Sequence, residues 1–163
     1  MTRTLRMLAA GVVPAALLLA GCGDGGGGAS GFPLRLTVQP ADSVAPGDSL
    51  HMTAYLVNPG ATAARLEFEN QCQVVFYVQA PDKSVLHPAG GGTACMGAPA
   101  GLQIPPRDSV RFDDVWLVTS RYVEAHSAYA VLWDYRLAGE GEREMEAGHR
   151  SNIVEFRVAH PPR

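Results

Sequence analysis

The chain has 163 residues, which suffices for one domain with an extra segment at one end but not for two full domains. Hydrophobic residues make up 47% and charged residues 18%, so the chain can form a buried core, and the composition argues against wholesale disorder. The formal net charge of −3 argues against a nucleic-acid-binding protein, which concentrates basic residues on one face. The 18 glycines and 12 prolines favour a turn-rich β protein over a helical bundle.

The N-terminus has the layout of an export signal. Arg3 and Arg6 precede Met7 to Leu19, an uncharged and mostly apolar run that is shorter than the roughly 20 residues of a membrane-spanning helix. Leu19-Ala20-Gly21-Cys22 follows and resembles the lipobox of bacterial lipoproteins. The resemblance implies that Cys22 becomes the first mature residue and carries a diacylglycerol. An ordinary signal peptide with a coincidental cysteine is the alternative.

Three segments are therefore expected. Residues 1–21 form the lipoprotein signal peptide, residues 22–31 contain the lipidated cysteine and a Gly-rich tether, and residues 32–163 form the folded domain. As a Gly-rich coil, the tether has a mean reach of about 15–18 Å. The lipoprotein resemblance implies a cell-envelope protein held to the membrane by its lipid. It also implies that Gly23, next to Cys22, favours the outer membrane, facing the periplasm, if the cell has two membranes.

Cys72 and Cys95 remain once Cys22 is assigned to the lipid. An exported domain folds in an oxidising compartment, where two thiols pair, so we predict a disulfide between them. Two independent free thiols, or a metal site, are the alternatives. The chain has no Cys-x-x-Cys, and neither cysteine has a histidine within four residues, so zinc-site spacings are missing.

Apolar residues recur with a period of two along the mature chain, which predicts strands. The expected strands are 34–38, 49–57, 65–69, 74–78, 84–87, 110–118, 128–137 and 152–158. In the segment 128–137, Tyr129, Val131, Trp133 and Tyr135 share one face. Ser120–His126 is long enough for one helical turn, and Glu140–Ala147 is expected to be a solvated connection. The pattern predicts an all-β fold, an immunoglobulin-like antiparallel β-sandwich of seven or eight strands.

One stretch of the chain carries a recurring set of strand and turn motifs. They are Val57-Asn58, Leu66-Glu67-Phe68, Asn70-Gln71-Cys72, Val75-Phe76-Tyr77-Val78, Pro81-Asp82-Lys83, Ile104-Pro105-Pro106 and Val115-Trp116. This set resembles the intracellular proteinase inhibitor (BsuPI-type) family. The resemblance implies an immunoglobulin-like fold and raises proteinase inhibition as a function, but it transfers no reactive-site residue. The chain departs from the family in having Glu69-Asn70-Gln71 in place of Ser-Gly-Gln, and in being addressed outward.

Gly47-Asp48-Ser49-Leu50 matches the signature of the GDSL esterases, in which the serine is the nucleophile. Those enzymes also need Asp-x-x-His near the end of the chain, and here Arg157 stands three residues before His160. Without a base and an orienting carboxylate, Ser49 has no means of activation. We therefore predict a turn that opens a strand and no catalytic residue.

Metal sites are not expected either. The histidines at 51, 87, 126, 149 and 160 show no i, i+2 or i, i+4 spacing. Cys95-Met96 has no histidine at the spacing of a cupredoxin-like copper site. The glutamates at 140, 142, 144 and 146 match no calcium loop, and Arg143 and Arg150 offset their charge. We predict no metal and no cofactor.

The segment His87–Arg107 is expected to be a long loop without regular structure. Cys95 would tie it back to Cys72, and a braced loop loses little entropy when it binds a partner. It is a candidate inhibitory contact, and a structural decoration is the alternative. The sequence as a whole predicts a lipid-anchored, non-catalytic β-sandwich that binds another envelope protein, with a protease as the sharper hypothesis and an assembly accessory as the competing one.

Overall fold

The computed structural model describes residues 31–89, 95, 97–120, 124–139 and 145–159, and every regular element within these ranges is a strand. The elements are β1 (Leu34–Gln39), β2 (Ser43–Val44), β3 (Ser49–Val57), β4 (Ala64–Phe68), β5 (Val74–Gln79), β6 (Val85–His87), β7 (Ala100–Ile104), β8 (Ser109–Leu117), β9 (Ala125–Leu132), β10 (Arg136–Leu137) and β11 (Val154–Val158). The predicted all-β class is confirmed. No helix in these ranges is long and apolar enough to cross a membrane.

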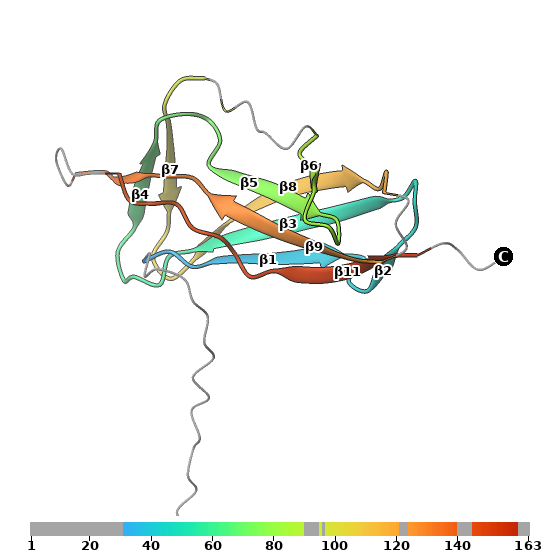
Figure 1. The fold of residues 1–163 in the computed structure, drawn as a ribbon. Helices are drawn as coiled ribbons and strands as arrows, with labels where there is room; N and C mark the ends of the chain where they lie inside the picture. Colours follow the sequence, from blue (N-terminus) through green and yellow to red (C-terminus); the bar gives the residue numbers. More distant parts are fainter. Residues whose placement is uncertain (1–30, 90–94, 96, 121–123, 140–144, 160–163) are drawn as a thin grey trace, which may run out of the picture.

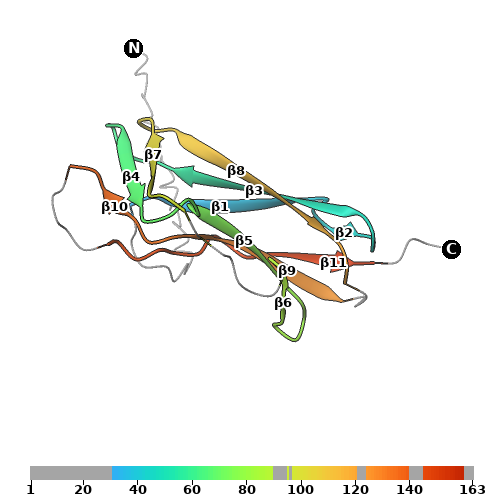
Figure 2. The same cartoon turned by 90° about the horizontal axis from the view of Figure 1, so that it is seen from above.

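The strands form two main layers and a small third sheet (Figures 1 and 2). Sheet 1 has the order β1-β3-β8, sheet 2 has the order β2-β11-β9-β5-β6, and the end sheet has the order β10-β4-β7. All pairings are antiparallel except that of β2 with β11. The first part of the chain thus contributes β1 to one sheet and β2 to the other. This is an immunoglobulin-like β-sandwich, as predicted.

Alternation of side chains explains how the two sheets share one core. In β3, the residues Leu50, Met52, Ala54 and Leu56 are fully buried, while the intervening residues face outward. The inward faces of β1 and β8 in the same sheet, of β5, β9 and β11 in the opposite sheet, and of β4 in the end sheet supply the other apolar side chains of this core. A strand period of two places all residues of one parity on one face, so the pattern alone decides which side chains fill the space between the sheets.

The expected strand 128–137 is interrupted, because β9 ends at Leu132, so Tyr129, Val131, Trp133 and Tyr135 do not form one continuous strand face. Ala128, Ala130 and Leu132 are fully buried, whereas Tyr129 and Val131 lie on the outer face of sheet 2. Both faces of this strand are apolar, so its sequence pattern does not show which face is buried. Beyond β9 the chain leaves the strand, and Tyr135 returns to the core, with its ring centroid 6.1 Å from that of Phe32.

The structure differs from the sequence-based expectations at β7, at β2 and at the start of β9. The segment His87–Arg107 is not without structure, because β7 lies within it and pairs with β4 through five residue pairs. The two-residue strand β2 was not predicted, and with β7 and the break between β9 and β10 it brings the number of strands among the described residues to eleven. Ala125 and His126 belong to β9 and not to a helical turn.

Contacts of the His126 ring explain why Ala125 and His126 belong to strand β9. Nδ1 donates to the Glu124 carbonyl oxygen, 2.9 Å away, and Nε2 is hydrogen-bonded to the Ser120 hydroxyl at 2.9 Å. The ring also stacks on Phe156. A buried imidazole with both nitrogens satisfied holds this part of the chain in the sheet.

The predicted disulfide is confirmed. Cys72 is bonded to Cys95, with the two Cα atoms 5.4 Å apart. The bond joins the segment before β5 to the segment before β7. Residues 1–30, including Cys22, lie outside the described residues, as do residues 140–144 of the predicted connection; Glu146 of that connection pairs through its backbone with Tyr135.

Candidate protein-binding site

Ser49, the residue of the esterase-like motif, is the exposed first residue of β3. The turn before it is closed by hydrogen bonds from Gly47 N to the Val118 carbonyl and from Val118 N to the Asp48 carbonyl, both 2.9 Å. Gly47 has a φ angle of +92°, a backbone conformation that residues with a side chain rarely adopt. In the described part of the chain, no histidine is hydrogen-bonded to Ser49, and His160 lies outside it. The geometry is that of a turn that opens a strand.

The histidines lie apart from one another. His51 is exposed on sheet 1, His87 is paired with Asp114 (Nε2 to Oδ2, 2.7 Å), and His126 is in the core. Burial lowers the pKa of His149 below its ordinary value. Among the described residues, no three His, Cys, Asp or Glu side chains gather in a way that could hold a metal ion.

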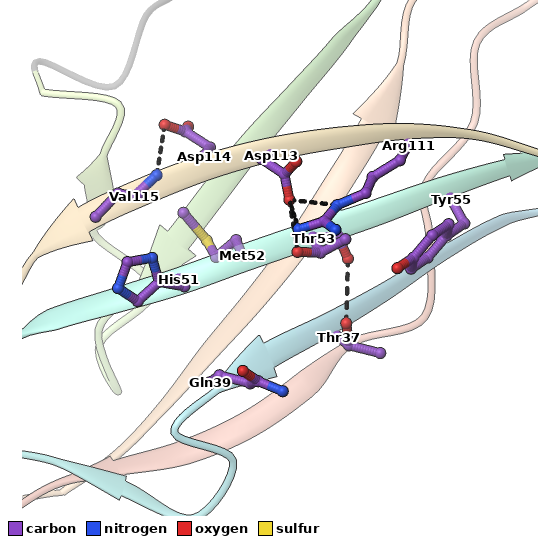
Figure 3. Close-up of a pocket in the computed structure, with 10 residues that line it drawn as sticks. All are labelled: Thr37, Gln39, His51, Met52, Thr53, Tyr55, Arg111, Asp113, Asp114 and Val115. Atoms are coloured by element: carbon purple, nitrogen blue, oxygen red, sulfur yellow. Dashed lines mark hydrogen bonds and ion pairs between the residues drawn. The ribbon is translucent and has the colours of Figure 1, made fainter.

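The outer face of sheet 1 is hollowed into a polar concavity of about 450 Å³ (Figure 3). At its centre, Asp113 Oδ1 accepts hydrogen bonds from Arg111 Nε at 2.9 Å and Nη2 at 2.8 Å, and from the Thr53 hydroxyl at 2.7 Å. Arg111 and, less strongly, Thr53 hold the pKa of the Asp113 carboxyl below its usual range. These groups already satisfy one another, so a ligand here would have to replace existing hydrogen bonds and would gain little.

The outer face of sheet 2 is different in character. The rings of Tyr77 and Tyr129 are stacked, with centroids 5.1 Å apart and planes 13° from parallel. The Arg150 guanidinium carbon lies 4.7 Å from the Tyr129 centroid, on the ring face. Ile153 is 55% exposed and precedes Val154, which pairs with Ala128 next to Tyr129. We call Tyr77, Tyr129, Arg150 and Ile153 the aromatic face.

Strand register builds this face from three distant parts of the chain. Tyr77 of β5 lies directly opposite Tyr129 of β9, and Val75 lies opposite Val131 beside them. Directly opposed residues have Cβ atoms about 4.5–5.5 Å apart, which is the spacing that ring stacking needs. An isolated backbone bridge between Val131 and Arg150 brings the arginine to the same strand.

The aromatic face is suited to binding a protein. Tyrosine and arginine are enriched among the residues that dominate interface energies, and isoleucine adds an apolar contact. The rings are held in place before any partner arrives, because they stack on each other and Gln79 Nε2 donates to the Tyr129 hydroxyl at 3.3 Å. Side chains that are already ordered lose less entropy on association. In the concavity of sheet 1, by contrast, the charged side chains of Arg111 and Asp113 are already paired with each other, so they are less available to a partner.

Tyr129 should report on this arrangement in a pH titration. Burial raises the pKa of its hydroxyl above 10, and Arg150 partly offsets the effect. The pKa of Tyr129 is therefore higher in the folded protein than in the unfolded chain. Its contribution to the free energy of unfolding is fully present below the unfolded-state pKa and is lost as the pH rises through the folded-state pKa. In titrations followed by tyrosinate absorbance, we expect Tyr129 to ionise after an unperturbed tyrosine, and Arg150→Ala to delay it further. An earlier ionisation in Arg150→Ala would contradict the contact.

Sequence reasoning placed the contact elsewhere, in the His87–Arg107 loop. Part of that loop pairs with the end sheet as β7, Cys95 is tied to Cys72, and residues 90–94 and 96 lie outside the described residues. The sequence pattern predicts that Tyr77 and Tyr129 lie in strands. It does not predict that the two rings stack, because stacking depends on the pairing register of β5 with β9, for which no local sequence signal exists.

Comparison with known proteins gives no family. No family model matches the chain, and no curated protein matches it. Similar solved structures include the CARDB domain of the PF1109 protein from Pyrococcus furiosus, in complex with di-metal ions (9% identity, 78% of this chain, 87% of that chain, TM-score 0.44). PapD-like domain 7 of human CEP192 is 11% identical, with 97% of this chain and 100% of that chain covered and a TM-score of 0.42. The C-terminal domain of wzt is 9% identical, with coverages of 82% and 77% and a TM-score of 0.43. At these values the similarities carry no argument about function.

Proposed function

We propose that this chain is a membrane-anchored envelope lipoprotein whose non-catalytic β-sandwich binds another protein through the aromatic face. The observation that carries the proposal is the stack of Tyr77, Tyr129 and Arg150 beside the exposed Ile153. It is a preordered apolar and aromatic surface on the outside of a domain whose inner faces are fully used by its own core.

The lipid anchor is supported by the sequence of the first 22 residues. A basic start, an apolar run and Leu19-Ala20-Gly21-Cys22 occur in the order that bacterial lipoproteins have. The proposal places the protein in the cell envelope, with the outer membrane favoured if the cell has two. Mass spectrometry of the mature chain tests this part: the expected product begins at Cys22 and carries a diacylglycerol, and an unmodified chain would contradict it.

Affinity capture from detergent-solubilised membranes tests the binding site. We expect the wild-type protein to retain a defined partner and the Tyr77→Ala/Tyr129→Ala variant to bind that partner at least tenfold more weakly, because truncating a tyrosine at a hot spot of an interface costs about 2 kcal/mol or more. Tyr55→Ala is the matched control, since it removes a half-buried tyrosine from the outer face of sheet 1. Equal loss in both variants, or in neither, would reject the aromatic face as the site.

An exported protease is the partner class that we propose to test first, with an assembly accessory role as the alternative. The BsuPI-type resemblance between Val57 and Trp116 supports the inhibitor version. The test is an inhibition panel of exported serine proteases with the purified chain. No inhibition at high molar excess would leave the assembly role.

A further inference from the structure

The edge strands of the two main sheets differ in how they are covered. At one edge of sheet 1, the side chain of Asn152 covers β1, because its Oδ1 accepts from Leu36 N at 2.8 Å and its Nδ2 donates to Leu36 O at 3.1 Å. Sheet 2 ends in β2 and β6, which have only two and three residues. The other edge of sheet 1 is the nine-residue strand β8, which has no strand on its outer side among the described residues (Figure 3). A long uncovered edge strand is a template for pairing with another chain.

The pairing of β8 with β3 determines which backbone groups of β8 face the free edge. Asn58 N donates to Asp108 O at 2.8 Å, and at the other end of the two strands Val118 N donates to Asp48 O at 2.9 Å. Both bonds fit the antiparallel register of the two strands. Because backbone groups alternate in direction along a strand, the even-numbered residues of β8 face β3. The odd-numbered residues direct their N–H and C=O groups to the free edge.

Two of these outward N–H groups are already covered by neighbouring carboxylates. Ser109 N donates to Asp108 Oδ1 at 2.7 Å, and Val115 N donates to Asp114 Oδ1 at 2.8 Å. The second cap is itself held in place, because Asp114 Oδ2 pairs with His87 Nε2 at 2.7 Å. A capped N–H group can join a neighbouring strand only by giving up an existing hydrogen bond.

Arg111 and Asp113 lie between these two caps and form an open window. Their outward N–H groups have no hydrogen-bond partner among the residues that the structure describes. In an antiparallel sheet, opposed residues of this kind exchange both of their N–H···O bonds. A strand with a matching window could therefore bond to both residues without disturbing either cap.

A second copy of β8 offers the same window, and its charges select one register. If the two strands run antiparallel and are centred on Phe112, Arg111 lies opposite Asp113 of the second copy, and Asp113 lies opposite Arg111. Centring the pair on Arg111 or on Asp113 would instead place like charges directly opposite each other, which is destabilising. Any more distant register would need the capped N–H group of Ser109 or of Val115.

The two charged side chains have capacity for this pairing. Asp113 Oδ1 accepts from Arg111 Nε and Nη2 and from the Thr53 hydroxyl. Asp113 Oδ2 and Arg111 Nη1 have no hydrogen-bond partner in the described part of the chain. The charges of the two copies would alternate in sign around a square, so the pair within each copy is kept and a pair is added on either side of the centre.

We propose that a second copy of this chain docks on β8 by antiparallel edge pairing centred on Phe112, which joins the three-stranded sheet 1 of each copy into one continuous sheet. The assembly is closed, because each copy uses its uncovered edge and Asn152 covers the opposite one. The two-fold axis is perpendicular to sheet 1, so both aromatic faces lie on the same side of the dimer. A partner with matching surfaces could then bind both faces at once, which increases its overall affinity. The pairing itself does not depend on the lipid anchor.

Charge reversal with two tagged copies tests the register. Two preparations of the full chain, which carry different C-terminal affinity tags, are mixed in detergent. One tag is captured, and the amount of the other tag that is retained is measured. The variants are R111D and D113R, each against itself and then mixed with each other. R65D is the matched control, because Arg65 also has a carboxylate partner two residues along an exposed strand face, Glu67 at 3.9 Å, but β4 is the central strand of the end sheet.

We expect wild-type copies to retain each other, and R111D or D113R against itself to be retained at least about fivefold less, because like charges then lie directly opposite each other. Mixing R111D with D113R places opposite charges across the edge again, so retention should return to the wild-type level. R65D should behave like the wild type. No retention between wild-type copies, no loss in the single variants, or a loss that mixing does not restore would each overturn the proposed pairing.

Discussion

Replacing Asn58 by alanine is expected to lower the free energy of unfolding by about 3–5 kcal/mol. Asn58 is 3% exposed. Its Nδ2 donates to the carbonyl oxygens of Thr62 at 2.9 Å, Ile104 at 3.2 Å and Pro105 at 3.0 Å, and its Oδ1 accepts from Gly60 N at 2.9 Å. One side chain thus ties the turn after β3 to the end of β7. Alanine leaves these backbone groups without a partner, at about 1–3 kcal/mol for each group that water cannot reach.

Urea unfolding followed by circular dichroism measures this loss. The matched control is Asn70→Ala, because the Asn70 Oδ1 makes one hydrogen bond, to Cys72 N at 2.8 Å, in a half-buried turn. We expect the control to lose about 1 kcal/mol or less. A loss below 1 kcal/mol for Asn58→Ala would show that the turn does not depend on this side chain.

Removing the disulfide is expected to cost about 3 kcal/mol. Cys72 and Cys95 are 23 residues apart in sequence, and closing a loop of that size removes conformational entropy from the unfolded chain. The double variant Cys72→Ala/Cys95→Ala should therefore unfold at clearly lower urea concentration than the oxidised wild type. A fully reduced wild type should behave like the variant.

The same urea series contains its own control. The double variant should not respond to reductant, because it has no bond left to reduce between β5 and β7. If oxidised wild type and double variant unfold at the same urea concentration, the bond contributes nothing to stability, and the bracing of the 87–107 segment loses its basis.

Local pattern was sufficient for most strands. In β3, strict alternation from Leu50 to Leu56 predicts both the strand and its buried face, and the structure agrees. Alternation fails where both faces are apolar, as in β9, because it cannot tell which face the second sheet covers. It also fails for β7, whose five residues between prolines and glycines show no strong pattern and gain their structure by pairing with β4.

The candidate site could not be predicted from the sequence, because it depends on which residues of two distant strands pair with each other. The pairing of Cys72 with Cys95 could be predicted from the cysteine count together with the expectation that the chain is exported to an oxidising compartment. The aromatic face depends on Tyr77 and Tyr129, which are far apart in the chain and meet through one register among many. The sequence does not mark Asn58 as a buried residue, because a polar residue that follows a strand gives no sign in the sequence that it will be buried.

Photo-cross-linking in intact cells tests the central claim most directly. A photoreactive amino acid at position 153, beside the Tyr77–Tyr129 stack, is compared with the same residue at position 37, on the outer face of sheet 1. The account predicts a discrete protein adduct from position 153 and none of that mass from position 37. The same adduct from both positions, or an adduct from position 37 alone, would contradict it.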